Sequence, residues 1–355
     1  MAAAVSIITS LFAGCGKKTT DTTPTTTDTR KKTEVKVGLS TDAGGKGDKA
    51  FNDAAISGLK KIQKEYTIEP VILESKNQNV YNKNLTALAG KCNLTFGVGD
   101  LMQQSVIDTA KANPNKTFAI IDNVIDLPNV VSISFKANEG SFLVGVLAGK
   151  ATRTNKVGFI GGTNIPLIER YEAGFIAGVM SVNPIAAADL INRKNTIYTQ
   201  KFNDPNAGRE AAKALYNAGC DVIYHASGSC GLGLLDTAKQ LREAGKNVWA
   251  IGADQDQAQT VPKDAGAILS SSVKRVDTAA YLATKSLIDG NLKGGTTMVL
   301  GLREEGVGIA STKNPKAPAG IYDLADKYKK AIIDGKIVVP ETLDLAKSFK
   351  PVAIE

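Results

Sequence analysis

The sequence contains very little histidine, and this shortage limits the chemistry that it can support. One histidine, His225, occurs among 355 residues. A hydrolase with a Ser-His-Asp triad would have to use this residue, and no G-x-S-x-G motif accompanies it. Histidine and cysteine do not cluster with the spacing of a metal site, so no bound metal is expected. His225 is therefore interpreted as a structural residue at a strand end.

Cysteine is scarce as well, and its positions argue against a disulfide framework. The four cysteines are Cys15, Cys92, Cys220 and Cys230. If Cys15 is set aside, an odd number remains. The segment 221–226 reads as a strand between Cys220 and Cys230, and a strand extends by about 3.3 Å per residue, which keeps the two sulfurs beyond bridging distance. Buried free thiols are expected.

No hydrophobic run is long enough to span a bilayer, but the N-terminus has the features of an export signal. Residues 1–14, MAAAVSIITSLFAG, are uncharged and end in small residues, as in a signal peptide. The following Cys15 completes a sequence, LFAGC, that resembles a bacterial lipobox, in which the cysteine is lipidated. We therefore expect a protein anchored by lipid to the extracytoplasmic face of the cell membrane.

Residues 15–33 have the composition of a disordered tether. Nine of the fifteen residues from Thr19 to Thr33 are threonine, so the segment has little to bury. It contributes +3 to the formal net charge of +8, and a basic segment beside a membrane is attracted to anionic headgroups. The body has no basic cluster interleaved with aromatics, which makes a nucleic-acid partner a poor interpretation.

The rest of the chain alternates short apolar runs with amphipathic segments. Strands are predicted at 35–39, 70–73, 94–98, 117–122, 130–135, 156–162, 196–199, 221–226, 248–251 and 268–273, with helices between most of them. Such alternation is typical of parallel α/β sheets. With 43% hydrophobic residues and 355 positions, the chain can form two domains. We predict two Rossmann-like lobes joined by a hinge of several strands: 34–138 plus 265–293, and 139–264 plus 294–355.

Three acidic residues follow predicted strands at the edge where ligands bind in open parallel sheets. Asp42, Asp122 and Asp254 end the segments GLSTD, FAIID and WAIGAD. Ionised carboxylates there can accept paired hydrogen bonds from the vicinal hydroxyls of a ribose. Each acid taken alone could equally be a helix N-cap or a turn residue. Their number favours a ligand site between the lobes.

Three further residues are candidates for the same site. Phe51 begins a predicted helix directly after a glycine-rich turn, where an aromatic ring can stack on a planar base, although it could also anchor the helix in the core. Asn52 offers a donor and an acceptor to a base edge. Lys274 follows the polar run Ser270 to Ser272 and could neutralise the acids, although a lysine there is more often a surface residue.

Other classes of protein fit parts of this pattern. Gly45, Gly47 and Ala50 match the G-x-G-x-x-G/A fingerprint of dinucleotide-dependent oxidoreductases, with Glu74 ending the next strand. Asp42 and Asp48 would face the pyrophosphate, which argues against that interpretation. A sugar-binding protein of the same fold and a purely adhesive surface lipoprotein remain open alternatives.

Several segments together resemble a known family. DAGGKGDKAFND, KVGFIGG, DVIYHASGSCGLG, WAIGADQDQ and ILSSSVKR are similar to motifs of the basic membrane protein family, lipoproteins typified by purine nucleoside receptor A. The resemblance implies a type I periplasmic-binding-protein fold. It also implies a protein that delivers purine nucleosides to an ABC transporter permease. We further expect a monomer that is not an enzyme and has no cofactor.

The resemblance also assigns residues. The family's ribose-binding acids correspond to Asp42, Asp122 and Asp254, its stacking aromatic to Phe51 and its lysine to Lys274. A second aromatic usually completes the base sandwich; Tyr224 is the candidate, with core packing as the alternative. The segment Ser229-Cys230-Gly231 departs from the family's pattern.

Overall fold

The computed structural model describes residues 28–352 and 354. The predicted signal peptide 1–14 and the lipidation site Cys15 lie outside the described residues, as does most of the predicted tether. Within the described part of the chain, no helix combines the length and the apolar character needed to cross a membrane.

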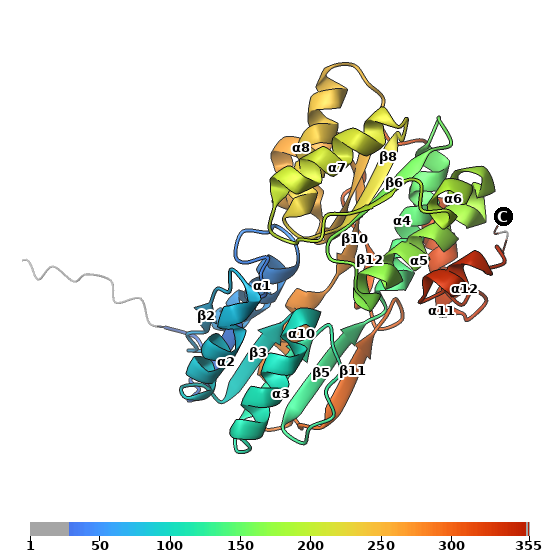
Figure 1. Cartoon of the computed structure of the whole chain (residues 1–355). Helices are drawn as coiled ribbons and strands as arrows, with labels where there is room; N and C mark the ends of the chain where they lie inside the picture. The colour runs from blue at the N-terminus through green and yellow to red at the C-terminus, as the bar shows by residue number, and fades with distance from the viewer. Residues whose placement is uncertain (1–27, 353, 355) are drawn as a thin grey trace, which may run out of the picture.

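Two parallel-sheet α/β lobes make up the body (Figure 1). The first sheet has the order β11-β5-β4-β3-β1-β2 and the second has the order β12-β10-β9-β8-β6-β7. All neighbours pair in parallel except β10 and β12, which are antiparallel. The strands are β1 (Val37–Ser40), β2 (Val71–Leu73), β3 (Leu94–Val98), β4 (Thr117–Ile121), β5 (Val130–Phe135), β6 (Val157–Gly161), β7 (Thr196–Tyr198), β8 (Val222–Ala226), β9 (Trp249–Asp254), β10 (Ile268–Lys274), β11 (Thr296–Leu300) and β12 (Val307–Ile309).

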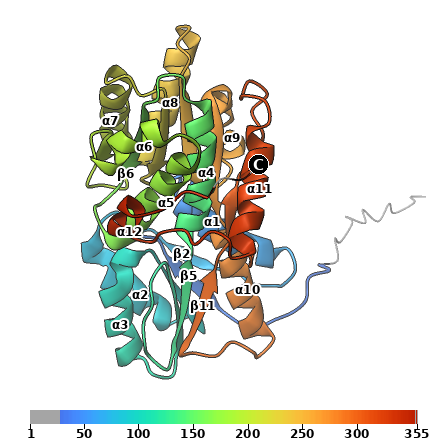
Figure 2. The same cartoon turned by 90° about the vertical axis from the view of Figure 1, so that its right-hand side faces the viewer.

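Helices cover both faces of each sheet, which is why the central strands are apolar along their whole length. In the first lobe α1 and α10 pack on one face, and α2 and α3 on the other. In the second lobe α4, α5 and α6 oppose α7 and α8 across the sheet (Figure 1, and from the side in Figure 2). The helices are α1 (Phe51–Gln63), α2 (Tyr81–Ala89), α3 (Gln103–Ala112), α4 (Ala137–Ala151), α5 (Pro166–Val182), α6 (Pro184–Ile191), α7 (Pro205–Asn217), α8 (Cys230–Glu243), α9 (Gln257–Thr260), α10 (Val276–Ile288), α11 (Ile321–Ile333) and α12 (Leu343–Lys347).

The two lobes share one topology, and the chain crosses between them three times. Each sheet is built from five successive strands in the same order and completed by a late edge strand. The crossings follow β5, β10 and β11, so three connections form the hinge. This arrangement confirms the predicted fold class of two parallel α/β lobes.

The predicted lobe boundaries are wrong at two places. Strand β10 pairs with β9 and β12 in the second lobe, whereas the prediction placed 268–273 in the first. Strand β11 pairs with β5 in the first lobe, although 294–355 was assigned to the second. A pattern of apolar residues predicts a strand but does not show which sheet the strand joins. Strand β10 is the fifth strand of the second lobe, just as β5 is the fifth strand of the first lobe.

The predicted tether also extends too far toward the body. The backbone N–H of Lys31 donates to the Glu65 carbonyl at 2.8 Å, and the N–H of Thr67 donates to the Lys31 carbonyl at 2.9 Å. Arg30 contacts the end of α1 through a hydrogen bond to the Gln63 carbonyl. These backbone hydrogen bonds hold residues 30–33 against the first lobe despite their threonine-rich composition.

Small residues let α4 and α5 approach closely. A Cβ atom at Gly145 would lie 2.4 Å from the Phe175 carbonyl oxygen, and one at Gly178 would lie 2.0 Å from that of Phe142. The predicted buried free thiols are present too, at Cys92, Cys220 and Cys230.

Candidate functional site

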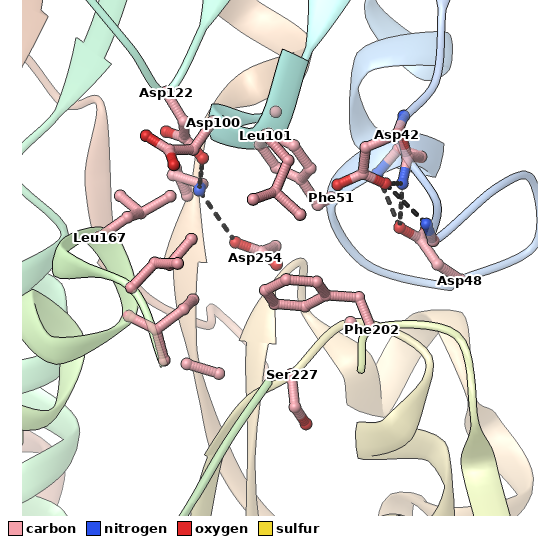
Figure 3. A pocket seen from close by; sticks show the side chains of 18 of the residues that line it. Asp42, Asp48, Phe51, Asp100, Leu101, Asp122, Leu167, Phe202, Ser227 and Asp254 are labelled. Carbon is pink, nitrogen blue, oxygen red and sulfur yellow. Dashed lines mark hydrogen bonds and ion pairs between the residues drawn. The ribbon is translucent and has the colours of Figure 1, made fainter. Parts of the chain in front are cut away.

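A cavity of about 560 Å³, counted to its open mouth, lies between the lobes where the carboxyl ends of both sheets face each other (Figure 3). The first lobe contributes Asp42, Gly44, Asp48, Phe51, Asn52, Gly99, Asp100, Leu101 and Asp122, and the second contributes Ile165, Leu167, Ile168, Tyr171, Phe202, Ala226, Ser227, Gly228, Asp254 and Lys274. The three predicted acids, Phe51, Asn52 and Lys274 therefore lie together, as expected.

Lys274 lies between two of the acids. Its Nζ is 2.5 Å from Asp122 Oδ2 and 3.5 Å from Asp254 Oδ1. Burial opposes the charge of Lys274, but the two carboxylates more than offset it and raise its pKa. Burial raises the pKa of Asp122, an effect that Lys274 only partly cancels. The other oxygen of Asp122, Oδ1, is buried without a hydrogen-bond partner among the described residues, so it can accept a ligand's hydroxyl.

Asp42 is held in place by its own lobe. Its Oδ1 accepts the backbone N–H of Gly44 at 2.8 Å and the side-chain amide of Asn52 at 2.7 Å. The backbone N–H of Asp42 donates to Asn52 Oδ1 at 3.1 Å. Burial raises the pKa of Asp42, with smaller contributions from Asp122 and Asp254. These contacts fix Asp42 with its second oxygen, Oδ2, beside Gly99.

The role predicted for Asn52 is wrong in one respect. Both hydrogens of its side-chain amide are used within the protein, on Asp42 Oδ1 at 2.7 Å and on Asp48 Oδ2 at 3.1 Å. Asn52 lines the cavity but has no amide hydrogen left for a base edge. Its contacts make it a positioning residue for Asp42.

Two aromatic rings lie on opposite sides of the cavity. Phe51 opens α1 in the first lobe, and Phe202 lies in the loop after β7 in the second (Figure 3). Lys274 Nζ lies 4.3 Å from the centroid of Phe51, so the ring also contacts the ion-pair cluster. Gly162 makes room for the other ring, since a Cβ there would lie 2.1 Å from Phe202 Cε1.

The prediction of Tyr224 as the second stacking aromatic is wrong. Its ring is fully buried in the core of the second lobe and packs against Phe159 and Phe175, with centroids at 5.6 and 5.1 Å. Its hydroxyl lies 3.0 Å from Ser141 Oγ. Tyr224 points from β8 toward α4 and α5, whereas Phe202 reaches the cavity from a loop.

Asp100 and Tyr171 are two polar residues of the cavity that were not predicted from the sequence. Asp100 follows β3 and its Oδ1 accepts the side-chain amide of Asn123 at 2.7 Å. Tyr171 lies on α5 and its hydroxyl donates to Asp254 Oδ1 at 3.3 Å. Asp100 carries the same strand-end signal as the predicted acids and could have been found with them. Tyr171 lies within a predicted helix, between Arg170 and Glu172, and carries no strand-end signal.

Asp122 and Asp254 have backbone conformations that non-glycine residues rarely adopt. Their φ angles are +73° and +65°, in the left-handed region. Such strain costs of the order of 1 kcal/mol or more and is concentrated at functional sites. The strain turns both carboxylates from their strand ends into the cavity.

The glycine-rich loop does not present the donors that a dinucleotide needs. Asp48 is buried, and its carboxylate accepts the backbone N–H groups of Ala50, Asn52 and Asp53 at 2.8 to 3.1 Å. A pyrophosphate would bind these same groups at a helix N-terminus. Glu74 is used by the loop itself, accepting the N–H of Lys46 at 3.1 Å. The geometry therefore disfavours the oxidoreductase alternative.

His225 occupies a structural position, as predicted. It is fully buried on β8, with Nε2 2.9 Å from Gln257 Oε1. Burial lowers its pKa to about 4.

Two like lobes around an acidic, aromatic-walled cavity define a solute-binding protein with a type I periplasmic-binding-protein fold. The family model of PnrA-like ABC transporter substrate-binding proteins matches residues 35–342. The chain belongs to this family.

Similarity to two known proteins and one solved structure supports this assignment. The chain is 37% identical over 347 residues to the CD4+ T-cell-stimulating antigen of Listeria innocua, covering 93% of this chain and 94% of that protein. It is 36% identical over 330 residues to the ABC transporter nucleoside-binding protein BmpA of Lactococcus lactis, covering 88% and 91%. Among solved structures, an ABC transporter solute-binding protein from Aeropyrum pernix superposes with a TM-score of 0.77 at 26% identity, covering 88% of this chain and 96% of that one.

Proposed function

We propose that this protein captures purine nucleosides between its lobes and delivers them to an ABC transporter. The observation that carries the proposal is the convergence of Asp42, Asp122 and Asp254 on one cavity walled by Phe51 and Phe202. The Lactococcus lactis relative is named a nucleoside-binding protein, which supports the same ligand class.

The acids suit a ribose. Each can accept hydrogen bonds from hydroxyl groups, and Asp122 Oδ1 has no other partner among the described residues. The three carboxylates face a single ammonium group, that of Lys274. A phosphate would bring more negative charge into this buried acidic site, which favours nucleosides over nucleotides.

The aromatic rings suit the base. Rings on both sides of the cavity allow a purine to stack between Phe51 and Phe202, and stacking on an aromatic side chain contributes about 1 to 3 kcal/mol per base. We assign contacts with the base edge to polar groups near these rings, with Asp100 and Ser227 as candidates. Closure of the lobes then buries the ligand, and the closed form is what the transporter recognises. No covalent chemistry is proposed.

The rest of the proposal concerns the cellular setting. We propose a monomer tethered through lipidated Cys15 to the extracytoplasmic face of the cell membrane. Replacing Cys15 by Ala should move the protein from the membrane fraction to the soluble fraction. Retention in the membrane fraction would contradict the anchor without affecting the ligand assignment.

Isothermal titration calorimetry tests the ligand. The protein is unfolded and refolded to remove any carried-over ligand, then titrated with adenosine, guanosine, inosine, free adenine, ribose and AMP. We expect submicromolar binding of nucleosides, with the free base, ribose and AMP much weaker. Equal binding of ribose would favour the sugar-binding alternative, and binding of none of these ligands would refute solute capture of this class.

A further inference from the structure

Next to the cavity, the lobes are joined by hydrogen bonds that converge on two adjacent carbonyl groups. In the first lobe, these carbonyls belong to Lys49 and Ala50, immediately before Phe51. In the second lobe, Gln255 Nε2 donates to the Ala50 carbonyl at 2.7 Å, and Gln257 Nε2 donates to the Lys49 carbonyl at 3.2 Å. Thr260 Oγ1 also donates to the Lys49 carbonyl, at 3.3 Å.

The loop that receives these bonds has an unusual backbone. Lys49 has a φ of +54°, and Ala50 has φ −144° with ψ −116°. The Asp48 carboxylate accepts the backbone N–H groups of Ala50 and Asn52 and so restrains the conformation of the loop. Bonds that fix the carbonyls of Lys49 and Ala50 therefore also fix where Phe51 enters the cavity.

Gln257 is the most constrained of the three donors. It is fully buried, and its Oε1 accepts the backbone N–H of Ala253 at 3.1 Å. Because a backbone N–H can only donate, the atom facing Ala253 must be the amide oxygen. The amide nitrogen then faces the Lys49 carbonyl, which can only accept. The Gln257 side chain thus links Ala253, which precedes Asp254 in the second lobe, to Lys49, which precedes Ala50 and Phe51 in the first lobe.

His225 holds Gln257 in this orientation. His225 Nε2 lies 2.9 Å from Gln257 Oε1, so Nε2 must carry the hydrogen. The other ring nitrogen, Nδ1, is then an acceptor, and it lies 3.4 Å from the hydroxyl of Ser227, which lines the cavity. The ring is neutral at pH 7, because burial lowers the pKa of His225 to about 4.

Two glycines provide space for this arrangement. A Cβ at Gly252 would lie 2.4 Å from Gln257 Oε1, and one at Gly231 would lie 2.0 Å from His225 Cε1. Any larger residue would displace the side chains that make the bonds.

We propose that Gln257, oriented by His225, is a latch that stabilises the closed form and positions the Phe51 loop. The chain of contacts runs from Ser227 in the cavity wall through His225 and Gln257 to Lys49 in the other lobe. It rests on the proposed function only for the identity of the ligand.

Gln257→Glu tests the latch with little disturbance of the second lobe. Glutamate keeps an oxygen for Ala253 and His225 but cannot donate to the Lys49 carbonyl when ionised. Gln259→Leu is the matched control, since Gln259 lies on the same helix and donates only to Asp256 and Thr312 of its own lobe.

The first readout is the interlobe distance without ligand. Spin labels on unnatural residues at exposed Lys111 of α3 and Lys213 of α7 report it by double electron–electron resonance. We expect a closed population in the wild type and the control, and a smaller one in Gln257→Glu. Equal populations in all three proteins, or no closed population in the wild type, would overturn the latch.

The second readout is the rate of nucleoside release by stopped flow. A bond made only after closure slows dissociation, so Gln257→Glu should release ligand roughly 2- to 12-fold faster with an unchanged association rate, the effect of one neutral hydrogen bond. An unchanged release rate, or a purely slower association, would overturn the proposal. If the wild type bound no nucleoside, the proposed function would fail while the distance measurement would still decide the latch. Thermal unfolding of each variant verifies that it is folded.

Discussion

Replacing Asp122 by Ala should separate ligand binding from folding. Asp122 Oδ1 is buried in the cavity wall without a partner, so a ligand hydroxyl is its natural donor. A hydrogen bond to a charged group contributes about 1.5 to 3 kcal/mol, which corresponds to a loss of roughly 10- to 150-fold in nucleoside affinity. The fold should persist, because Lys274 keeps Asp254 at 3.5 Å.

Calorimetry with matched ligands makes this prediction specific. If Asp122 binds a ribose hydroxyl, the deoxynucleoside that lacks that hydroxyl should lose much less affinity on the substitution than the parent nucleoside does. The coupling between the two changes measures the contact itself. Asp126→Ala is the control, because Asp126 is exposed in the same loop and should leave affinity unchanged.

Two results would refute the reasoning. An unchanged affinity of Asp122→Ala would remove Asp122 from the ribose site. Equal losses for the parent, 2′-deoxy and 3′-deoxy nucleosides would show that the substitution acts through the cavity's shape or charge. Thermal unfolding under the same conditions tests whether the variant is folded.

Further predictions concern other residues of the site and its supports. Lys274→Met should lower the unfolding free energy by about 3 to 5 kcal/mol, because it leaves two buried acids without their cation. Urea titration should show a smaller deficit at lower pH, where Asp122, whose pKa is raised by burial, takes up a proton. Phe202→Ala should weaken nucleoside binding by about 1 to 3 kcal/mol with little effect on ribose, whereas Tyr224→Phe should leave both affinities unchanged in calorimetry. His225 should titrate near pH 4 in an NMR experiment, which is clean because the chain has one histidine. The pKa of His225 is lower in the folded protein than in the unfolded chain. The unfolding free energy should therefore fall as the pH decreases from 6.5 toward 4, because the unfolded chain takes up the proton first. A titration midpoint near 6.5 in the folded protein would contradict the burial of His225.

Local patterning predicted the elements of the fold well and their assembly less well. The strands 94–98 and 130–135 have the predicted bounds, because both are apolar runs between polar turns. The placement of 268–273 in the first lobe was wrong. This segment pairs with β9 and β12, and the local sequence does not indicate with which strands a segment pairs. Counting strands would have helped: each lobe has five successive strands before the chain leaves it.

The site was predictable where a residue's position in the sequence determines its position in space. Asp42, Asp122 and Asp254 follow strands, and strand ends meet at one edge of a parallel sheet. Phe202 lies in a loop, and its place opposite Phe51 depends on how the lobes close and on the missing side chain of Gly162. Tyr224 was the wrong candidate because it lies inside β8, where both faces of the sheet are covered by helices, and not at the carboxyl end that borders the cavity.

The shared topology of the lobes accounts for the chemistry of the cleft. Strands β4 and β9 occupy the same position in their sheets, and Asp122 and Asp254 lie at their carboxyl ends with the same left-handed backbone. When equivalent edges face each other, two like charges must meet across the gap, which is unfavourable unless a cation lies between them. Lys274 is that cation, and it stands at the end of β10, the last strand before the chain leaves the second lobe. Lys274 forms its shorter ion pair, 2.5 Å, with Asp122 of the other lobe, so the group that neutralises the site also links the two lobes.

Opening the lobes would separate Asp122 from Lys274. The third acid, Asp42, has no equivalent cation among the described residues that line the cavity. The closed cleft is therefore better suited to a neutral ligand rich in hydroxyl groups than to an anion.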